Sequence, residues 1–367
     1  MNVLISWTGL TGYTGSNWRA LQRLPGVKVK AYVEPTAMDQ AFDAARELGG
    51  LDYRVLRPGR KPEDEVVDEV AAFHPDMMLI VGWRAKSCRW FATHRAWRDV
   101  PKVLVCDMPF AWTPRKILAK FALAGYLRHF AAAFVPGEPS ARYMRWLGFG
   151  GRRPVFTGLN ATDLKRFAKP GLARDPKAPP RFLFVGRYAP EEGLAVLLEA
   201  YAKYRARVKT PWTLDCVGVG PEGARLQGVE GVNDLGFRTP KELARIYVEH
   251  DAFVLPSLHE PWGVVLAEAA GAGLPVVCTS ACGACREVVR EMRFRKMRIQ
   301  GGADCGNGLV VPPGDPQALA DALVKIHSLN RAERQLAGEV GKKLAAPFSS
   351  EAWAERVMEM AKEIVGL

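Results

Sequence analysis

The chain lacks the features that would place it in or across a membrane. No apolar run reaches the ~18 residues that a membrane-spanning helix requires. The first residues, Met1-Asn-Val-Leu-Ile-Ser6, contain no basic segment followed by an apolar one, so we expect a first strand there and not a secretion signal. The seven cysteines, an odd number, then predict reduced thiols in a cytoplasmic protein.

The sequence also contains no internal repeat and no low-complexity tract. Its 367 residues are more than one ordinary hydrophobic core accommodates. The apolar fraction of 48% and the charged fraction of 25% are typical of folded globular proteins. We therefore expect two globular domains.

Acidic residues are scarce in the first half of the chain. Residues 1–170 hold 26 Lys/Arg and 15 Asp/Glu, whereas residues 171–367 hold 25 and 24. Residues 83–153 alone hold 14 bases and three acids. The same stretch contains five of the ten tryptophans, namely Trp83, Trp90, Trp97, Trp112 and Trp146. One interpretation is a surface for an anionic membrane face or another anionic partner. The other is a solvated basic surface with tryptophan in the core. No nucleic-acid partner is expected.

Strand-like apolar runs alternate with helical patterns along the whole chain, which predicts α/β units with parallel strands. The expected strands are 3–6, 27–33, 77–81, 103–106, 155–157, 181–185, 213–217, 253–255, 275–278 and 309–311. The expected helices are 16–24, 114–134, 191–204, 241–249, 264–271, 316–328 and 350–364.

The Pro- and Gly-rich residues 169–180 divide this pattern and read as a linker. The predicted domains are therefore a Rossmann-like domain over 1–168 and a second one over 181–346. A helix over 347–367 is expected to pack back on the first domain.

Two carboxylates flank a turn in the segment Pro256-Ser-Leu-His-Glu-Pro-Trp-Gly263-Val-Val-Leu-Ala-Glu268. Glu260 precedes a predicted helix and Glu268 lies about one turn inside it, with Gly263 shaping the turn between them. The start of a helix offers free N–H groups to a phosphate. Carboxylates accept hydrogen bonds from sugar and ribose hydroxyls. The spacing alone is equally consistent with a capped amphipathic helix that carries two surface acids.

These residues and several further motifs resemble the signature of glycosyl transferases group 1, the retaining family-4 enzymes of the GT-B fold. The motifs follow the family's order along most of the chain. They are Val155–Asp163, Phe182–Tyr188, Val217–Pro221, Leu235–Leu243, Glu260–Glu268, Gly273–Val277 and Gly308–Pro316. The resemblance implies two Rossmann-like domains that face each other across a cleft, with cleft closure during the reaction.

The resemblance also implies roles for residues of the second domain. Glu268 would bind the ribose, Glu260 would orient the donor sugar, and Arg187 would neutralise the diphosphate. Phe237 and Arg238 would lie near the nucleobase. The remaining residues expected to line the donor site are Gly186, Gly218, His259, Trp262, Gly263 and Val264.

In the first domain the resemblance points to the first strand–helix turn and to the end of a later strand. Gly12 and Gly15 would let the turn approach the phosphates, although this spacing also fits any tight turn. Asp107 stands near the position where family members often carry a histidine, and it would polarise a sugar hydroxyl. An Asp that caps a loop at the end of a strand is the alternative.

The sequence departs from the family at one position of the phosphate site. The family usually has Lys five residues after the Arg, and this chain has Glu192 there. A carboxylate repels a diphosphate by about 1 kcal/mol or more at ~4 Å even in high dielectric. Either another base takes over, the donor sits differently, or turnover is weak.

The spacing Cys278-x3-Cys282-x2-Cys285, with Cys305 beyond, allows a metal hypothesis. The flanking residues instead resemble a family variant of a loop that ends in Glu287-Val-Val. No metal and no cofactor are expected; a UDP- or GDP-type sugar would be the co-substrate.

The predicted activity is retaining transfer of a hexosyl unit from a nucleotide-diphosphate sugar to a hydroxyl acceptor, either a lipid-linked or a membrane-proximal glycan. The leaving phosphate would help to accept the acceptor's proton, while the protein supplies positioning and charge stabilisation. The alternatives are a sugar-nucleotide epimerase of the same fold and a non-catalytic GT-B scaffold. The expected location is the cytoplasm, with peripheral attachment to the inner membrane face if the basic stretch binds lipid.

Overall fold

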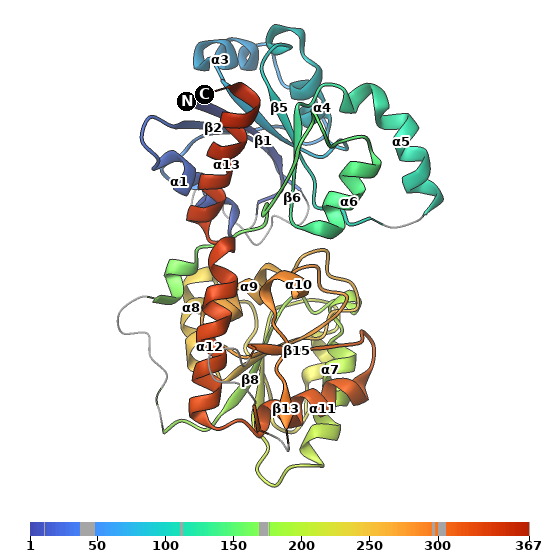
Figure 1. The fold of residues 1–367 in the computed structure, drawn as a ribbon, viewed down its shortest axis with the longest axis vertical. Coiled ribbons are helices and arrows are strands. Elements are labelled where there is room, and N and C mark those ends of the chain that lie inside the picture. Colours follow the sequence, from blue (N-terminus) through green and yellow to red (C-terminus); the bar gives the residue numbers. More distant parts are fainter. Residues whose placement is uncertain are drawn as a thin grey trace. The chain divides into compact units, whose positions relative to one another are not determined.

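The computed structural model describes residues 1–10, 12–36, 48–110, 113–168, 175, 177–295, 298–299 and 306–366. The chain divides into two compact units (Figure 1). Unit 1 consists of Met1–Asp163 with Phe348–Leu367, and unit 2 is Leu164–Pro347. Most of the linker predicted over 169–180 lies outside the described residues.

Unit 1 contains a sheet of seven parallel strands in the order β3-β2-β1-β4-β5-β6-β7. These strands are β1 (Asn2–Thr8), β2 (Lys28–Glu34), β3 (Asp52–Val55), β4 (Met77–Val81), β5 (Lys102–Val105), β6 (Ala132–Val135) and β7 (Val155–Thr157). The central strands are buried on both faces, which explains why they read as continuous apolar runs and not as alternating ones.

Helices cover both faces of this sheet. Side chains of β1 alternate between the two faces, so that Ile5 joins one hydrophobic core and Leu4 the other. The first core also contains residues of α1 (Thr14–Gln22) and α13 (Ser350–Val365). The second contains residues of α3 (Glu65–Phe73), α4 (Lys86–Thr93), α5 (Pro114–Leu127) and α6 (Glu138–Trp146).

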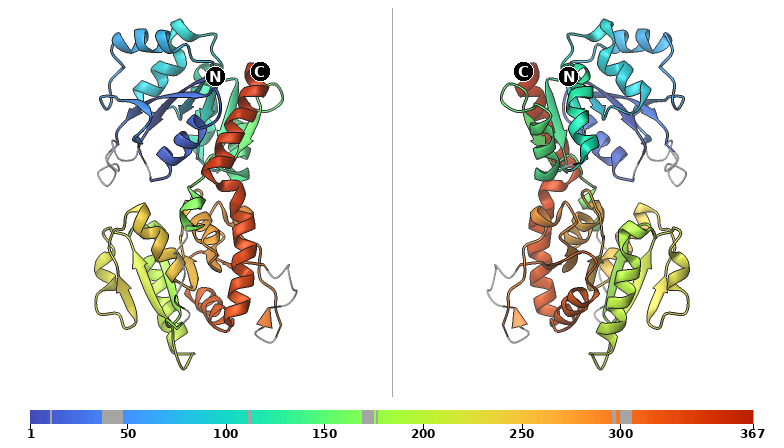
Figure 2. Two further views of the ribbon diagram at one scale, coloured as in Figure 1. Left: turned by 90° about the vertical axis from the view of Figure 1, so that its left-hand side faces the viewer. Right: turned by 90° about the vertical axis from the view of Figure 1, so that its right-hand side faces the viewer.

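The C-terminal helix α13 belongs to unit 1, where it packs on α1 (Figure 2). Ser349 caps its start by accepting a hydrogen bond from the Ala352 N–H. Trp353 is fully buried beside Phe134 of β6, with ring centroids 6.1 Å apart. The Ser350 hydroxyl donates to Asn17 Oδ1 at 2.7 Å, which joins α13 to α1. The last helix therefore completes one face of the first sheet.

Unit 2 contains a sheet of six parallel strands in the order β10-β9-β8-β11-β12-β15. They are β8 (Arg181–Val185), β9 (Thr213–Val217), β10 (Val232–Asp234), β11 (Ala252–Leu255), β12 (Val276–Thr279) and β15 (Gly308–Val311). Its helices are α7 (Leu194–Arg205), α8 (Pro240–Glu249), α9 (Val264–Gly271), α10 (Cys285–Val288), α11 (Pro316–His327) and α12 (Arg331–Ala345). A short antiparallel pair, β13 (Phe294–Arg295) with β14 (Arg298–Ile299), stands apart from this sheet.

The structure differs from the sequence prediction at a few elements. The helix predicted over 114–134 is wrong beyond residue 127, because Ala132–Val135 pairs with β5 and β7 as strand β6. The short 3-10 helix η3 (Leu164–Ala168), placed in the first domain from sequence, belongs to unit 2. There Phe167 packs edge-to-face on Tyr247 of α8, with centroids 5.4 Å apart.

No helix among the described residues combines the length and apolar character that crossing a membrane would require.

Candidate functional site

The carboxyl ends of β8 and β11 form the topological switch point of the unit 2 sheet. From β8 the chain continues to β9 and β10 on one side, and from β11 to β12 and β15 on the other. Open parallel α/β sheets bind ligands at such a point. Gly186 and Arg187 directly follow β8, and the segment that leads to Glu260 follows β11. The strands thus bring the predicted phosphate and sugar residues to one edge of the sheet.

Arg187 is held by two carboxylates of the turn that follows it. Its Nε and Nη2 donate to Glu192 Oε1 at 3.2 and 3.0 Å, and Nη2 also lies 3.0 Å from Glu191 Oε1. The Arg187 side chain is 56% exposed, whereas Glu192 is only 6% exposed. The Ser257 hydroxyl lies 3.5 Å from Glu192 Oε2. In this structure Arg187, the arginine predicted for the phosphate site, is therefore neutralised from within the chain.

Burial raises the pKa of Glu192, and the nearby charge of Glu191 adds to that effect. The Arg187 guanidinium and the Ser257 hydroxyl act in the opposite direction, because they stabilise the ionised carboxylate. The rise in pKa shows that burial outweighs the ion pair. Glu192 therefore takes up a proton at higher pH than an exposed glutamate.

Glu260 lies at the end of the segment that leaves β11, fixed by backbone contacts on both sides. Its N–H donates to Ala281 O at 3.3 Å, and its carbonyl accepts from the Gly283 N–H at 3.0 Å. Its Oε1 accepts from the Trp262 N–H at 3.1 Å. Burial raises the pKa of Glu260, and the Glu192 charge raises it further, against the lowering effects of Trp262 and Arg187. Glu192 and Glu260 thus influence each other's ionisation.

Two glycines permit the close packing of the loops at this edge. A Cβ at Gly218, whose φ is +155°, would lie 1.8 Å from the Gly186 carbonyl oxygen. A Cβ at Gly263, whose φ is +92°, would lie 2.7 Å from Cys282 Sγ. Both positions require glycine on conformational and steric grounds. The Gly-x-Gly turn after β9 therefore presses against the loop that carries Arg187.

Helix α9 begins at Val264, directly after Gly263, so its first N–H groups lack partners inside the helix. Glu268 lies in the second turn of α9, where its Oε2 accepts a hydrogen bond from the Tyr247 hydroxyl at 3.1 Å. Burial raises the pKa of Tyr247 well above its usual value, and Glu268 contributes to that rise. The tyrosine therefore stays protonated and orients the Glu268 carboxylate.

The other predicted donor-site residues differ in their accessibility. His259 is exposed, Phe237 is 43% exposed, and Arg238 is half-buried. The Arg238 guanidinium donates to the Phe237 carbonyl at 3.1 Å. Trp262 is buried, and its backbone serves to hold Glu260 and the loop at Ala284.

Unit 1 has a pocket of about 500 Å³ at its own switch point, between β1 and β4. The pocket is lined by the residues that follow β1, β4 and β5, together with Leu159 and Asn160. Asp107 lines this pocket and is exposed, while its main-chain carbonyl accepts from the Ser140 hydroxyl at 3.2 Å. The carboxylate predicted from sequence therefore lies in the larger of the two pockets described in unit 1.

The turn after β1 approaches the pocket through a different glycine from the predicted Gly12 and Gly15. Gly15 lies inside α1 and is buried, and Gly12 precedes that helix. The residue with positive φ is Gly9, at +74°, and it lines the pocket together with Leu10, Tyr13 and Thr14. The loop thus approaches the pocket through its first glycine.

A buried carboxylate, Glu34, supports the same pocket from the end of β2. Its Oε1 accepts from the Gly59 N–H at 2.8 Å, and its Oε2 accepts from the Ser87 hydroxyl. Ser87 follows the pocket-lining residues Arg84 and Ala85 at the start of α4. Glu34 therefore fixes the wall of the pocket that α4 provides.

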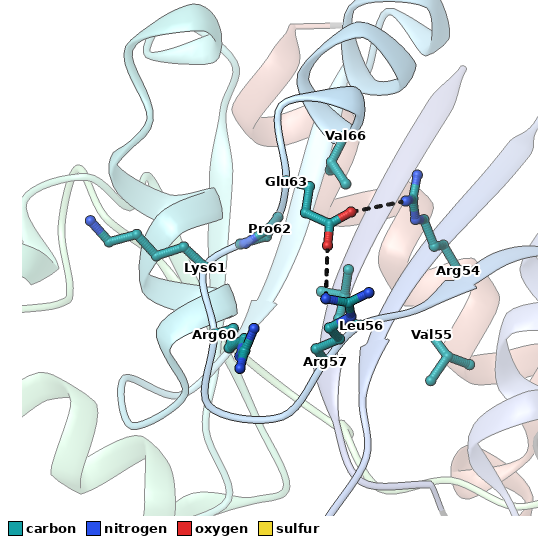
Figure 3. Close-up of a pocket in the computed structure, with 9 residues that line it drawn as sticks. All are labelled: Arg54, Val55, Leu56, Arg57, Arg60, Lys61, Pro62, Glu63 and Val66. Atoms are coloured by element: carbon teal, nitrogen blue, oxygen red, sulfur yellow. Dashed lines mark ion pairs between the residues drawn. The ribbon is translucent and has the colours of Figure 1, made fainter.

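A second pocket in unit 1, of about 300 Å³, lies at the turn between β3 and α3 (Figure 3). There the Glu63 carboxylate lies 3.9 Å from an Arg54 nitrogen and 3.5 Å from an Arg57 nitrogen. Glu65 also pairs with Arg54, at 3.2 Å. Arg54 and Arg57 are thus paired with acids of the same turn, and we assign no ligand to this pocket.

The cysteines of the spacing Cys278-x3-Cys282-x2-Cys285 are buried free thiols, and Cys305 lies outside the described residues. Cys282 Sγ donates to the Trp262 carbonyl at 2.9 Å. Among the described residues, no group of three or more His, Cys, Asp or Glu side chains could hold a metal ion.

Sequence reasoning missed Glu191, Ser257 and the pocket residues Gly9 and Tyr13. Ser257 could have been found, because it comes two residues after a strand that flanks the switch point. Nothing in the sequence shows that Glu191 shares the Arg187 guanidinium with its neighbour.

Solved structures establish the class of fold. The Anabaena protein HepE, in complex with UDP and glucose, matches 98% of this chain and 99% of its own with a TM-score of 0.70 and 16% identity. Sucrose-phosphate synthase from Thermosynechococcus elongatus matches 99% of each chain with a TM-score of 0.66 and 18% identity. The two parallel-sheet α/β units thus have the GT-B fold of these glycosyltransferases, as predicted.

Sequence comparison finds relatives of the second unit. Residues 179–328 match the model of glycosyl transferases group 1, so the predicted resemblance is confirmed over this segment. A D-inositol 3-phosphate glycosyltransferase of Corynebacterium urealyticum is 31% identical over 194 residues, 49% of this chain and 42% of the relative. A phosphatidyl-myo-inositol mannosyltransferase of Mycobacterium leprae is 33% identical over 183 residues, which are 46% of this chain and 42% of the relative. The match thus spans less than half the length of these curated relatives.

Proposed function

We propose that this protein is a retaining glycosyltransferase that moves a hexosyl unit from a nucleotide-diphosphate sugar to a hydroxyl acceptor. The observation that carries the proposal is the convergence of Arg187, Glu260 and the start of α9 at the switch point of unit 2. This edge offers a cation, an acceptor of hydroxyl hydrogen bonds and free helix N–H groups. A sugar diphosphate needs all three.

The nucleotide would occupy the remainder of this edge. Glu268, oriented by Tyr247, would accept hydrogen bonds from the ribose hydroxyls. The exposed Phe237 and the half-buried Arg238 would lie beside the base. A UDP- or GDP-type donor fits this proposal, and the family segment 179–328 covers all of these residues.

Donor binding must overcome the internal neutralisation of Arg187. A diphosphate competes with Glu191 and Glu192 for the guanidinium, which carries one charge against their two. The raised pKa of Glu192 eases this competition, because a protonated Glu192 neither repels phosphate nor pairs strongly with arginine. Weak donor binding in comparison with a site that has a lysine here is the expected consequence.

The acceptor would occupy the pocket of unit 1 lined by Asp107 and Asn160. The exposed Asp107 carboxylate would accept a hydrogen bond from an acceptor hydroxyl and orient it. The acceptor is proposed to be a glycan, either lipid-linked or close to a membrane.

Retention would follow from attack on the face that the leaving group departs from. The bond between the anomeric carbon and the diphosphate oxygen breaks while the acceptor oxygen bonds to the same face. The acceptor's proton passes to a leaving phosphate oxygen. The chain's contribution is then to hold the sugar through Glu260 and to stabilise charge on the diphosphate through Arg187.

The test is release of nucleoside diphosphate from a panel of UDP- and GDP-sugars, with the product anomer assigned by NMR. Glu260→Ala should reduce turnover by roughly 100-fold or more, as loss of a positioning contact in a transition state does. Glu199→Ala, a change of the exposed acid on α7, is the matched control and should retain activity. Wild-type turnover in the Glu260 variant, or an inverted anomer, would contradict the assignment.

One observation favours a second candidate, a non-catalytic scaffold of the same fold. The ion pairs of Arg187 with Glu191 and Glu192 leave the phosphate site without net positive charge. If no nucleoside diphosphate or nucleotide sugar binds at millimolar concentration, the scaffold is the better account.

A further inference from the structure

Helix α5 of unit 1 presents an apolar face to solvent. Thr113 caps its start by accepting a hydrogen bond from the Lys116 N–H, and Pro114 occupies the first turn. Its inner side is anchored by Leu123, Tyr126 and Leu127, which are buried. The helix is therefore fixed to unit 1 by its C-terminal half, and the side chains on its other face are free of the core.

That other face carries large apolar side chains. Leu118 is 66% exposed, Phe121 is 75% exposed and Ile117 is 42% exposed. Leu118, Phe121, Ala122 and Gly125 follow the i, i+3, i+4, i+7 spacing of one helix face, and all four are exposed. Three of the eight large apolar side chains exposed in the described part of the chain lie on this helix. Such a concentration indicates a contact surface.

Two lysines of α5 lie against the neighbouring helix α6 (Figure 1). The Lys116 Nζ lies 5.1 Å from the Tyr143 ring centroid and the Lys120 Nζ 5.1 Å from that of Trp146, so the two helices are in contact. Residues 113–153 hold eight Lys/Arg and a single acid, Glu138. Arg145 already pairs with that acid at 2.7 Å. The exposed Lys120 of α5 and Arg142 of α6 thus add positive charge to this pair of helices.

We infer that the exposed face of α5, together with the basic residues of α5 and α6, docks the protein on an anionic lipid surface. Apolar side chains on one helix face, flanked by cations, fit the boundary between acyl chains and anionic headgroups. A second copy of this chain is a poorer occupant, because a symmetric contact would bring two strongly basic segments together. The apolar part of the surface is Ile117, Leu118 and Phe121.

The tryptophans of the basic stretch contribute less to this surface than their number suggests. Trp97 is buried, and the Trp90 ring packs on it with centroids 5.1 Å apart. Trp146 lies under the Lys120 ammonium group, and Trp112 lies outside the described residues. The docking surface is therefore defined by α5 and α6, whereas Trp90 and Trp97 serve packing.

The inference does not depend on the donor site, since the surface lies in unit 1 and its test uses no sugar nucleotide. Full-length protein would be sedimented with vesicles of phosphatidylcholine that contain 30% phosphatidylserine (about one lipid in three), or with phosphatidylcholine alone. Wild-type protein should bind the anionic vesicles at low salt and be released at high salt. It should bind the neutral vesicles weakly.

Two variants separate the apolar and the charged parts of the surface. Leu118→Ser/Phe121→Ser should weaken binding to anionic vesicles by roughly tenfold or more. Lys120→Gln/Arg142→Gln should weaken it and reduce its dependence on salt. The matched control is Val55→Ser/Leu336→Ser, which removes two exposed apolar side chains elsewhere and should leave binding unchanged. Thermal unfolding establishes that each variant is folded.

Three results would overturn the inference. The first is that wild-type protein does not bind anionic vesicles at low salt. The second is that it binds neutral vesicles equally well. The third is that the α5 variant and its control lose the same amount of binding to anionic vesicles. A wild-type dimer in solution that the α5 variant abolishes would assign this face to a second copy of the chain instead.

Discussion

Glu192 combines a buried position, an ion pair and a raised pKa in one side chain. At the scale of single residues it decides how strongly the proposed donor site binds. Its carboxylate accepts hydrogen bonds from Arg187, and its charge also raises the pKa of Glu260. The chemistry of the site therefore depends on whether Glu192 carries its proton.

Replacing Glu192 with lysine should tighten nucleoside diphosphate binding by about tenfold or more. The change removes a repulsive charge, frees Arg187 and adds a cation. The free energy of each of these effects is comparable to that of one charge pair near a protein surface. Isothermal titration calorimetry with UDP and GDP measures the affinity. Glu230→Lys makes the same charge change before β10, at the amino end of the sheet, and should have little effect. Unchanged or weaker binding in the Glu192 variant would count against a diphosphate at this edge.

Donor affinity should rise as the pH falls from about 8 towards the raised pKa of Glu192. Burial raises the pKa of Glu192, so the folded protein takes up this proton above the usual range of glutamate, and the protonated form does not repel phosphate. A nucleotide-diphosphate sugar keeps its charges over this range, so the change reports on the protein. Glu192→Gln should bind more tightly at pH 8 and lose most of the pH dependence. An identical pH profile in that variant would show that another group is responsible.

The raised pKa of Glu192 also makes the stability of the folded protein depend on pH. The folded-state pKa is higher than the unfolded one, so ionisation of Glu192 favours the unfolded chain. Stability should therefore fall as the pH rises through the window between these two values. Above that window Glu192→Gln removes the cost of the buried charge, while below it the variant has no such advantage.

At the scale of elements, the loops after β8 and β9 depend on a contact between two backbones. Gly218→Ala should lower the free energy of unfolding by at least about 3 kcal/mol, because its Cβ would lie 1.8 Å from the Gly186 carbonyl. Gly228 also has a positive φ, +70°, but no atom lies within 4 Å of its Cβ position. Gly228→Ala should therefore cost only about 1 kcal/mol. Urea denaturation compares the two, and equal losses would show that steric contact at Gly218 is unimportant.

The sequence predicted most central elements, and the failures have physical reasons. Buried parallel strands such as β4 and β11 are continuous apolar runs that begin after an Asp and end at a Gly or a Pro, so their existence could be read directly. Strand β6, Ala132–Val135, follows α5 without a Gly or Pro between them, and only its pairing with β5 and β7 makes it a strand. Helix α12 had a readable signal that was missed, the capping box of Asn330 with Glu333.

The residues of the candidate site could be predicted from the sequence, but their contacts could not. Arg187, Glu260 and Glu268 could be named in advance because the family motifs fix their spacing. Their contacts could not, since Glu192 appears in the sequence only as an unexpected acid. The hydrogen bond from Tyr247 to Glu268 joins two helices that no local pattern relates.

At the scale of the whole molecule, the C-terminal helix links the end of the chain to the first sheet. Trp353→Ala should lower the stability of unit 1 by about 3 kcal/mol or more, because it empties a fully buried site beside Phe134. Unit 2 has its own core and should unfold as before. Calorimetry should then show a separate, earlier transition in the variant, whereas Glu355→Ala on the exposed side of α13 should not produce one. If the unfolding temperatures of both units fell together, the two units would unfold as one.

The central claim is that the switch point of unit 2 binds a nucleotide-diphosphate sugar. Its most direct test is calorimetric titration of the full chain with UDP- and GDP-sugars, using wild-type protein, Glu260→Ala and the Glu199→Ala control. The proposal predicts saturable binding of one donor type to the wild type and to the control, with much weaker binding to the Glu260 variant. Absence of binding by the wild type at millimolar donor, or equal affinity in all three proteins, would contradict it.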